Sequence, residues 1–340
     1  MRFIPTLSLK VKIALAFFAA LALLVVGFIV VSFSQYTGAR EYAEAEKTVF
    51  IKPGTGGRAI LRQLHDEGVI PAPWIITLPM MLGHDATSLK AGEYLFTSGM
   101  SPYEVLSKIS AGEVVPHKIT IPEGWKVYQI RSLLEKEPLL TGDLPPNITE
   151  GSVFPETELF QRGEKRADVI ARLQKRMRDA LDEAWKERAD DLPFTTKREA
   201  LILASIVEME TGVPDERGHV AAVFVNRLRD GMRLQTDPTV VYGIEQEHGV
   251  MERALTTNDL ARDTPWNTYT RDGLPPTPIC SPGLASIKAV LNPPHSDDYY
   301  FVAKGDGGHY FAENLREHQA NIVKYKARLR EIKEIEDSKE

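Results

Sequence analysis

The chain has 340 residues, and at about 100–200 residues per domain this length predicts two or three folded units. Apolar residues make up 43% and charged residues 26%, which excludes a wholly disordered chain, a collagen-like chain and a protein with many membrane spans. The single cysteine, Cys280, excludes an internal disulfide framework and a cysteine-rich zinc module, and we expect it to be a small buried side chain. The net charge of −6 argues against a nucleic-acid partner, whose binding requires basic patches.

An uncharged apolar stretch lies near the amino terminus, from Ile13 to Phe33. At about 1.5 Å per residue it is long enough to cross the hydrocarbon core of a bilayer as a helix. Positive charges precede it within residues 1–12, and none follows until Arg40. This asymmetry predicts a cytoplasmic tail over 1–12 and residues 34–340 on the other side of the membrane. The alternative is a cleaved signal peptide, whose apolar core is normally shorter, at about 7–15 residues.

A first small α+β unit is predicted over residues 48–115, after a polar linker over 34–47. A strand at Val49–Ile51 turns into a helix over about 58–67. The sequence Ser101-Pro-Tyr-Glu104 is a capping box with proline at the first helical position, so a further helix begins there. Between these elements the pattern predicts a helix from about Pro73 to Leu82 and a strand at Gly92–Phe96.

A second small α+β unit, with a connector rich in proline and glycine, is predicted over residues 116–163. Its strand, Lys118–Ile121, again precedes a turn and a helix. The two units match weakly at an offset of 69 residues, as in Arg62 and Arg131. This match indicates either a duplicated module or a chance likeness between two strand–turn–helix segments, and the sequence leaves both open.

The region 164–340 is predicted to be the largest unit, and it holds the most informative helix. Another capping box, Thr196-Lys-Arg-Glu199, opens this helix. Residues Ala200–Val207 are apolar on almost every side, a pattern typical of a buried helix. Two glutamates, Glu208 and Glu210, fall in its last turn.

A carboxylate in that position is disfavoured by its apolar surroundings and by the negative end of the helix dipole, so its pKa is expected to rise. A protonated carboxyl in a cleft can act as general acid on a glycosidic oxygen. Residues two apart on a helix point about 200° apart, so Glu208 and Glu210 cannot serve one site. The helix pattern does not choose between them, and for either one the alternative is a structural pairing with an arginine.

Three hydrogen-bonding side chains, Gln235, Thr236 and Asp237, lie together between apolar flanks and suit recognition of sugar hydroxyl or acetamido groups. The alternative for them is a turn before Pro238. Farther along, the proline-rich segment Asn267–Gly283 is predicted to be irregular and to form the wall of a groove.

The histidines of the chain are scattered and show no spacing typical of metal ligands, so we predict no metal and no cofactor. His309, beside two glycines, is expected either to contact substrate or to lie at the turn of a hairpin. A last helix is expected to dock on the body through four apolar or aromatic side chains, which are Ile322, Tyr325, Leu329 and Ile332.

Short motifs run through the chain beyond the apolar stretch. They are Lys90-Ala-Gly-Glu-Tyr94, Pro122-Glu-Gly124, Phe154-Pro-Glu-Thr157, Ala204-Ser-Ile-Val-Glu-Met-Glu-Thr211, Asn226-Arg-Leu228, Gly231-Met-Arg-Leu-Gln-Thr-Asp-Pro-Thr239, Asn267-Thr-Tyr269, Gly273-Leu-Pro-Pro276 and Gly307-Gly-His309. Any one of them is weak, but together they are specific: the sequence resembles the endolytic murein transglycosylases of the YceG-like (MltG) family.

The resemblance implies a bacterial inner-membrane protein of the α+β class, with its body in the periplasm. It implies one transmembrane helix (13–33), a LysM-like α+β subdomain (48–115) and a larger mixed α+β catalytic domain (164–340). It also implies that the second glutamate of the E-x-E-T motif, Glu210, is the catalytic residue. The implied reaction cuts the β-1,4 bond between N-acetylmuramic acid and N-acetylglucosamine in nascent peptidoglycan, leaves 1,6-anhydro ends and terminates strand elongation.

The partners implied are peptidoglycan glycan strands, the inner membrane, and peptidoglycan synthases or division proteins. The candidates for glycan contacts are Arg233, Gln235, Thr236, Asp237 and Tyr269. Two alternatives stay open. One is a muramidase-type hydrolase with Glu156 or Asp237 as second carboxylate, and the other is a non-enzymatic peptidoglycan-binding scaffold.

Overall fold

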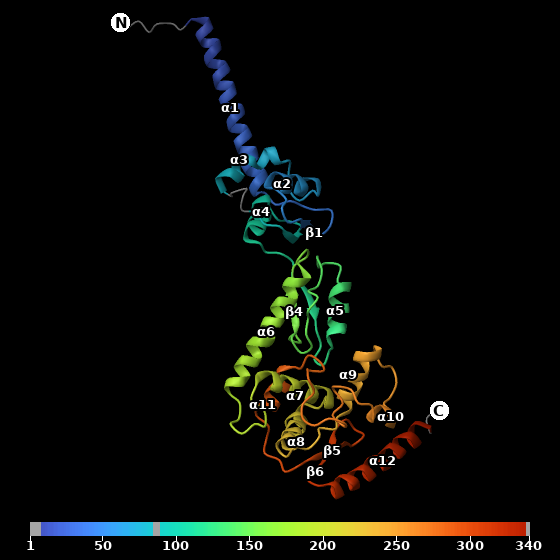
Figure 1. Ribbon diagram of the computed structural model, residues 1–340. Coiled ribbons are helices and arrows are strands. Elements are labelled where there is room, and N and C mark those ends of the chain that lie inside the picture. The colour runs from blue at the N-terminus through green and yellow to red at the C-terminus, as the bar shows by residue number, and fades with distance from the viewer. Residues whose placement is uncertain (1–7, 84–88, 338–340) are drawn as a thin grey trace. The chain divides into compact units, whose positions relative to one another are not determined.

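The computed structural model describes residues 8–83 and 89–337 (Figure 1). The chain divides into two compact units. The first unit comprises Met1–His117 and Leu159–Glu164, and the second comprises Lys118–Glu158 and Lys165–Glu340. Each unit is described by itself below.

The first unit begins with helix α1, Leu9–Thr37, which has 29 residues and extends past the predicted stretch Ile13–Phe33 at both ends. Within the described residues it is the one helix long and apolar enough to cross a membrane. Its last turns belong to the folded unit, because Tyr36 is only 3% exposed in the hydrophobic core there. The segment 34–47, expected as a linker, therefore starts as helix packed on the unit, and backbone hydrogen bonds hold its later part. It is not a free stalk.

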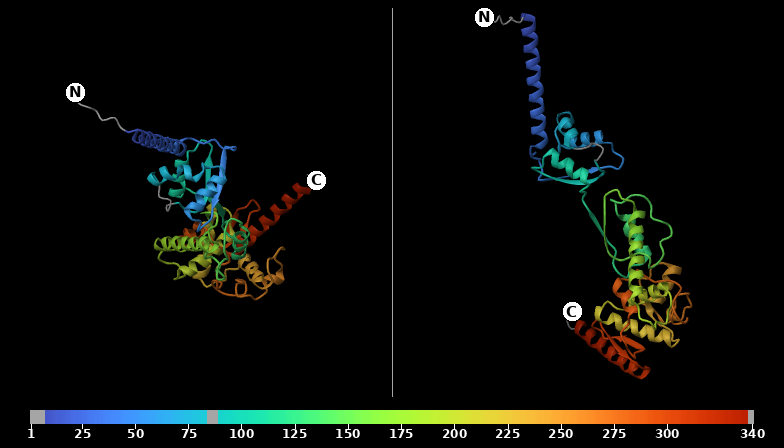
Figure 2. Two further views of the ribbon diagram at one scale, coloured as in Figure 1. Left: turned by 90° about the horizontal axis from the view of Figure 1, so that it is seen from above. Right: turned by 90° about the vertical axis from the view of Figure 1, so that its left-hand side faces the viewer.

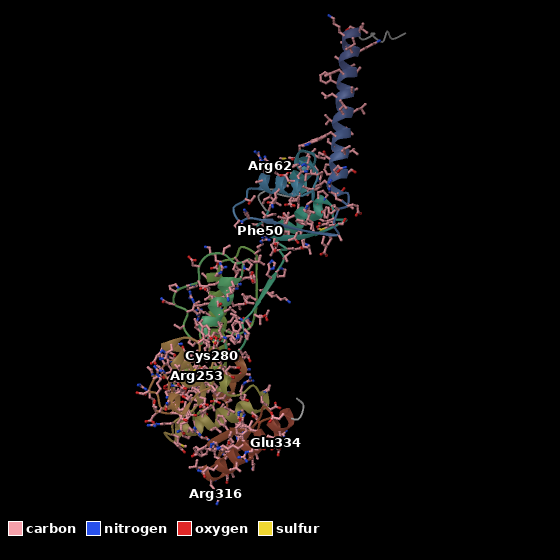
Figure 3. The ribbon with its side chains drawn as sticks, turned by 90° about the vertical axis from the view of Figure 1, so that its right-hand side faces the viewer. Phe50, Arg62, Arg253, Cys280, Arg316 and Glu334 are labelled. Carbon is pink, nitrogen blue, oxygen red and sulfur yellow. The ribbon has the colours of Figure 1, made fainter. Side chains whose placement is uncertain are left out.

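The rest of the first unit is a small module in which helices pack on a two-stranded sheet. Its elements are β1 (Glu46–Ile51), α2 (Gly57–Asp66), α3 (Pro73–Gly83), β2 (Gly92–Thr97) and α4 (Pro102–Ala111). Strands β1 and β2 are antiparallel, with Phe50 opposite Glu93. Figure 3 labels Phe50 on β1 and Arg62 on α2. The likeness of this module to LysM stays a prediction.

The capping box predicted before α4 is confirmed. The Ser101 hydroxyl accepts a hydrogen bond from the Glu104 amide at 3.3 Å, and the Glu104 carboxylate accepts one from the Ser101 amide at 2.7 Å. These two bonds satisfy amide groups that the first helical turn leaves without intrahelical partners.

Both segments of the offset-69 match form a strand followed by a helix. In the second case these are β3 (His117–Thr120) and α5 (Val127–Lys136). Strand β3 pairs with β4, Thr157–Phe160, so a short strand lies within the otherwise irregular connector predicted over 138–163.

The second unit is mainly helical and is built around the buried helix α7, Lys197–Glu210. Its neighbours in contact are α8 (Arg217–Arg229), α11 (Leu284–Leu291), α6 (Arg166–Lys186) and α9 (Asp237–His248). The predicted capping box of α7 is confirmed, and its residues Ile202–Val207 are all buried. Two shorter elements are η2 (Pro214–Glu216) and α10 (Thr257–Leu260). The sequence pattern did not predict α9, because its start at Asp237-Pro238 fits a binding cluster or a turn as well as a helix.

The last described elements are a hairpin and a long helix. Strands β5 (Tyr300–Ala303) and β6 (His309–Ala312) pair antiparallel, and α12 (Leu315–Asp337) packs against both, as Figures 1 and 2 show. Figure 3 labels Arg316 and Glu334 near the two ends of α12. The inward position expected for Leu329 is wrong, since 44% of that residue is exposed. The hairpin strands have four residues each, so they cover only part of so long a helix.

Candidate active site

The two glutamates at the end of α7 face different surroundings, as their spacing predicted. Glu208 accepts hydrogen bonds from the Gly283 amide at 2.9 Å and the Ser286 hydroxyl at 2.7 Å, both at the start of α11. The Arg217 guanidinium lies 4.0 Å from its other oxygen. Glu208 therefore ties α7 to the start of α11, with Arg217 of α8 close to its other oxygen.

Glu210 instead faces an open pocket of about 470 Å³. Its Oε1 accepts a hydrogen bond from the Thr236 hydroxyl. The pocket is lined by residues from α7, α8, the 234–237 loop, Tyr269, β5 and α12, which are Glu210, Arg227, Leu234, Gln235, Asp237, Tyr269, Tyr300, Phe301, Val302, Leu315, His318 and Ile322. Two acidic side chains, Glu210 and Asp237, thus line a pocket with both polar and aromatic walls.

The surroundings of Glu210 favour the protonated acid. Burial raises the pKa of its carboxyl from 4.5 to about 7, and the negative charge of Asp237 adds to this rise. The hydrogen bond from Thr236 and the positive charge of Arg227 act in the opposite direction. Near neutral pH the group can therefore both give and take a proton, which is what a general acid and base needs.

Hydrogen bonds to Thr268 fix the loop that carries Gln235 and Thr236. The Gln235 amide donates to the Thr268 carbonyl at 3.2 Å, and the Thr236 amide donates to the Thr268 hydroxyl at 3.1 Å. Thr239 completes the cluster at 2.9 Å from the Thr268 hydroxyl. Gln235 has φ = 48°, a left-handed conformation that non-glycine residues adopt at a cost and that is common at functional sites. These bonds hold the Thr236 hydroxyl against Glu210.

The predicted glycan-contact residues do not all occupy equivalent places. Gln235, Asp237 and Tyr269 line the pocket with Glu210, and the Tyr269 hydroxyl donates to Asp237 Oδ1 at 2.6 Å. Thr236 is buried behind them. Arg233 lies outside the lining set, where it donates to Asp272 at 2.8 Å and to the Tyr269 carbonyl at 2.9 Å. Its contacts position the Tyr269 segment.

The sequence reasoning missed Arg227 as part of this site. Its guanidinium donates to the carbonyls of Leu234 at 2.7 Å and Tyr299 at 2.6 Å, and it lies 5.2 Å from the Tyr300 ring. It thereby joins α8 to the Thr236 loop and to β5. The signal was present in the Asn226-Arg-Leu228 motif, because a cation on an otherwise buried helix face requires partners.

His318 on α12 was missed as well. Its ring stacks on Tyr300 at 5.1 Å, and its Nδ1 is buried without a hydrogen-bond partner among the described residues. Burial, together with the charge of Arg227, lowers its pKa below the usual 6.5. No sequence pattern brings residue 318 to a pocket built around residue 210.

Three other residues singled out from the sequence lie outside the pocket lining. His309, at the start of β6, contacts Glu216 through Nδ1 at 2.8 Å. Glu156 makes a two-pronged pair with Arg176, at 2.9 and 2.7 Å. Cys280 is fully buried, as expected, and burial raises the pKa of its thiol. Among the residues that the structure describes, no group of three His, Cys, Asp or Glu side chains could hold a metal ion.

Comparison with known sequences decides the family. The sequence model of the YceG-like family matches residues 49–324. The chain belongs to the YceG-like family. This YceG-like protein is 29% identical over 271 residues to the endolytic murein transglycosylase of Bacillus subtilis strain 168, a match that covers 71% of this chain and 74% of that protein.

The YceG-like protein is also similar to a protein from Streptococcus and to a solved structure from Listeria. The endolytic murein transglycosylase of Streptococcus pneumoniae D39 is 28% identical, over 82% of this chain and 58% of its own length. The crystal structure of a yceG-like protein from Listeria monocytogenes is 30% identical, covers 82% of this chain and 99% of that one, and superposes with a TM-score of 0.49.

Proposed function

We propose that this protein is a membrane-anchored endolytic lytic transglycosylase. Its proposed substrate is nascent peptidoglycan, in which it cleaves the β-1,4 bond between N-acetylmuramic acid and N-acetylglucosamine, leaves 1,6-anhydro ends and terminates strand elongation. The observation that carries the proposal is the Glu210 carboxyl, which has a pKa of about 7 and lines an open pocket. The names of the relatives from Bacillus and Streptococcus support the same reaction.

One carboxyl suffices for this chemistry. Glu210, as the acid, gives its proton to the glycosidic oxygen while the bond from C1 of the muramic acid to that oxygen breaks. The 6-hydroxyl of the same sugar then bonds to C1 and returns its proton to the Glu210 carboxylate. No water is consumed and the enzyme ends in its starting protonation state, whereas hydrolytic glycosidases usually need two carboxylates.

The neighbours of Glu210 fit these two steps. The Thr236 hydroxyl donates to Oε1, so Oε2 is the oxygen that can carry the proton. Asp237 and burial favour the acid that begins the reaction, and Arg227 favours the carboxylate that completes it. Gln235, Asp237 and Tyr269 are the proposed glycan contacts, with Thr236 and Arg233 as positioning residues.

The proposed location is the inner membrane, with the amino terminus in the cytoplasm and the body in the periplasm. Helix α1 supplies a segment of sufficient length and apolarity for one span, and the charge asymmetry around it supports the orientation. Peptidoglycan synthases and division proteins are proposed partners, because termination of a growing strand requires access to its synthesis.

The test is digestion of purified sacculi by the full chain in detergent, followed by mass spectrometry of the products before and after borohydride. We expect muropeptides with 1,6-anhydro ends that resist reduction, and none of them from a folded Glu210→Gln variant. Absence of product from the wild-type chain would favour the scaffold alternative, as would a Glu210→Gln strain with normal glycan strand lengths.

A second candidate is a hydrolase, which the position of Asp237 favours. Asp237 lies in the same pocket as Glu210 and could serve as a second carboxylate. Reducible ends in the sacculus digest, with equal loss of activity in Asp237→Asn and Glu210→Gln, would establish the hydrolase. Under the transglycosylase proposal Asp237→Asn loses at most one glycan contact and keeps far more activity than Glu210→Gln, and its pH dependence shifts downward because the charge that raises the Glu210 pKa is gone.

A further inference from the structure

Helix α3 of the small module shows apolar side chains on two opposite faces. Its sequence from Pro73 to Gly83 contains no charged residue. One face, with Ile76 and Met80, is buried in the module core. The other is exposed at a helical spacing: Trp74 (67% exposed), Leu78 (38%), Met81 (73%) and Leu82 (74%). An apolar patch of this kind is unfavourable in water and indicates a surface that binds something apolar.

The position of α3 along α1 identifies what covers this patch. Helix α3 packs against α1, and the Trp74 and Phe28 rings stack with centroids 6.2 Å apart and planes 9° apart. Phe28 belongs to the apolar stretch and precedes its end at Phe33 by five residues, or about 8 Å along the helix. The Trp74 side chain therefore lies at the depth of the membrane core rather than beyond it.

We propose that α3 is a second membrane-contacting element, an interfacial helix whose exposed face is embedded in the leaflet at the carboxyl end of α1. Interfacial helices enter a leaflet by about 5–10 Å, the depth that the Phe28–Trp74 stack gives. Tryptophan is the side chain most typical of that level. The patch also continues the exposed apolar surface of α1, on which Phe28 is 41% exposed.

With α3 embedded in the leaflet, the protein is attached to the membrane by two helices, α1 and α3. Because the last turns of α1 are packed into the module and α3 is embedded beside them, the small module rests on the lipid surface and its height above the membrane is fixed. The proposal rests on α1 spanning the bilayer, which is part of the proposed location.

The test uses the full chain reconstituted into phosphatidylcholine vesicles at a low protein-to-lipid ratio. Lipids brominated on the acyl chain quench tryptophan at membrane depth. The chain has four tryptophans, and the emission of Trp74 is obtained by subtracting the spectrum of a Trp74→Phe variant from that of the wild type. Trp74 is largely exposed, so this substitution leaves the fold intact, and Trp185→Phe on α6 is the matched control.

We expect brominated lipid to remove most of the Trp74 emission and aqueous iodide to leave it nearly unchanged. The quenched component should disappear in Trp74→Phe and remain in Trp185→Phe. A Met81→Asp variant places a charge on the exposed face and should restore quenching by iodide.

Iodide quenching of wild-type Trp74, or lipid quenching that is the same with and without Trp74, would overturn the proposal. Protection of Trp74 that appears only at high protein density would show instead that a second copy covers the patch. Alkaline extraction of the same vesicles tests α1 separately: a chain that is extracted refutes the span itself, whereas a retained chain with unquenched Trp74 refutes only the role of α3.

Discussion

Glu208 and Glu210 are two residues apart in the last turn of α7, and their carboxyl groups meet opposite conditions. Around Glu208, the Gly283 amide and the Ser286 hydroxyl donate two hydrogen bonds, and Arg217 stands 4.0 Å away. Around Glu210, one hydroxyl donates and the remaining side faces a pocket in which Asp237 adds a like charge.

The comparison shows that the helix end alone does not create a reactive carboxyl. Both side chains share the helix dipole and the buried helix that precedes them. The tertiary structure separates them, because it gives Glu208 two donors and leaves Glu210 with one donor in a pocket where burial and the charge of Asp237 raise its pKa. The following predictions test that separation.

The largest effect is expected for Glu210→Gln. Glutamine keeps the volume and can accept the Thr236 hydrogen bond, but it cannot supply a proton. We expect activity on sacculi to fall by about 10²–10⁴-fold, the usual contribution of a general acid or base, with an unchanged circular dichroism spectrum. A loss of activity of less than about fivefold would show that Glu210 is not the general acid and base.

The same variant should be more stable than the wild type at high pH. The folded protein holds the Glu210 proton up to about pH 7, whereas the unfolded chain releases it near 4.5, so the free energy of unfolding falls as pH rises between these values. Above pH 7 the free energy of unfolding of Glu210→Gln should exceed that of the wild type by up to about 3 kcal/mol. Near pH 4 the two proteins should be equally stable. Thermal melts of both proteins at pH 4 and pH 8 measure this difference.

Glu150 is a second carboxyl whose pKa burial raises to about 7, although the Val127 amide and the Tyr242 hydroxyl donate to it. Its titration changes the free energy of unfolding equally in the wild type and in Glu210→Gln. This contribution therefore cancels when the two proteins are compared. If Glu210→Gln raised the free energy of unfolding equally at pH 4 and pH 8, the pKa assigned to Glu210 would be contradicted.

Glu208→Gln should reverse the pattern, with a loss of stability and little loss of activity. The Gly283 and Ser286 bonds both end on Oε2, so a glutamine carbonyl oxygen can accept them only as weaker, neutral hydrogen bonds, and its NH2 group would face Arg217 in place of Oε1. We expect the free energy of unfolding to fall by about 1–3 kcal/mol. Activity per folded molecule should stay within about fivefold of the wild type. A loss as large as that of Glu210→Gln would mean that the two carboxyls act together.

The smallest effect is expected for Tyr269→Phe, which removes the hydroxyl bonded to Asp237 and keeps the ring. A single such bond contributes about 1 kcal/mol, or about fivefold in kcat/KM. If Tyr269 contacts glycan, the change should appear mainly in KM, and Arg233→Gln should give a milder version of it through the Tyr269 segment. An unchanged KM in both variants would place the glycan elsewhere in the pocket.

Much of the local structure could be predicted because the signals are local. The capping boxes at Ser101 and Thr196 and the apolar helix that ends in Glu208 and Glu210 follow from residues within one or two turns. Helix α9 was missed because its start, Asp237-Pro238, is also a turn signal, and only the packing of its buried residues against α7 favours the helix.

The site was predictable only in part. Gln235, Thr236 and Asp237 could be selected because polar side chains gathered between apolar flanks stand out in a sequence. Arg227 and His318 could not, since one is hidden in an apolar helix and the other lies in a charged helix. Each reaches the Glu210 pocket through a contact between segments distant in the chain.

By itself the sequence determined the long apolar stretch near the amino terminus, the buried helix with two acidic residues at its end, and a family resemblance carried by short motifs. Spacing along a helix is a local property, so it also showed that the two carboxyls diverge. The tertiary structure decided that Glu210 lies in a pocket and that its pKa rises, because burial and the like charge of Asp237 depend on segments distant in the chain. It also decided that α3 lies beside α1, since side chains at positions 28 and 74 come together only through packing.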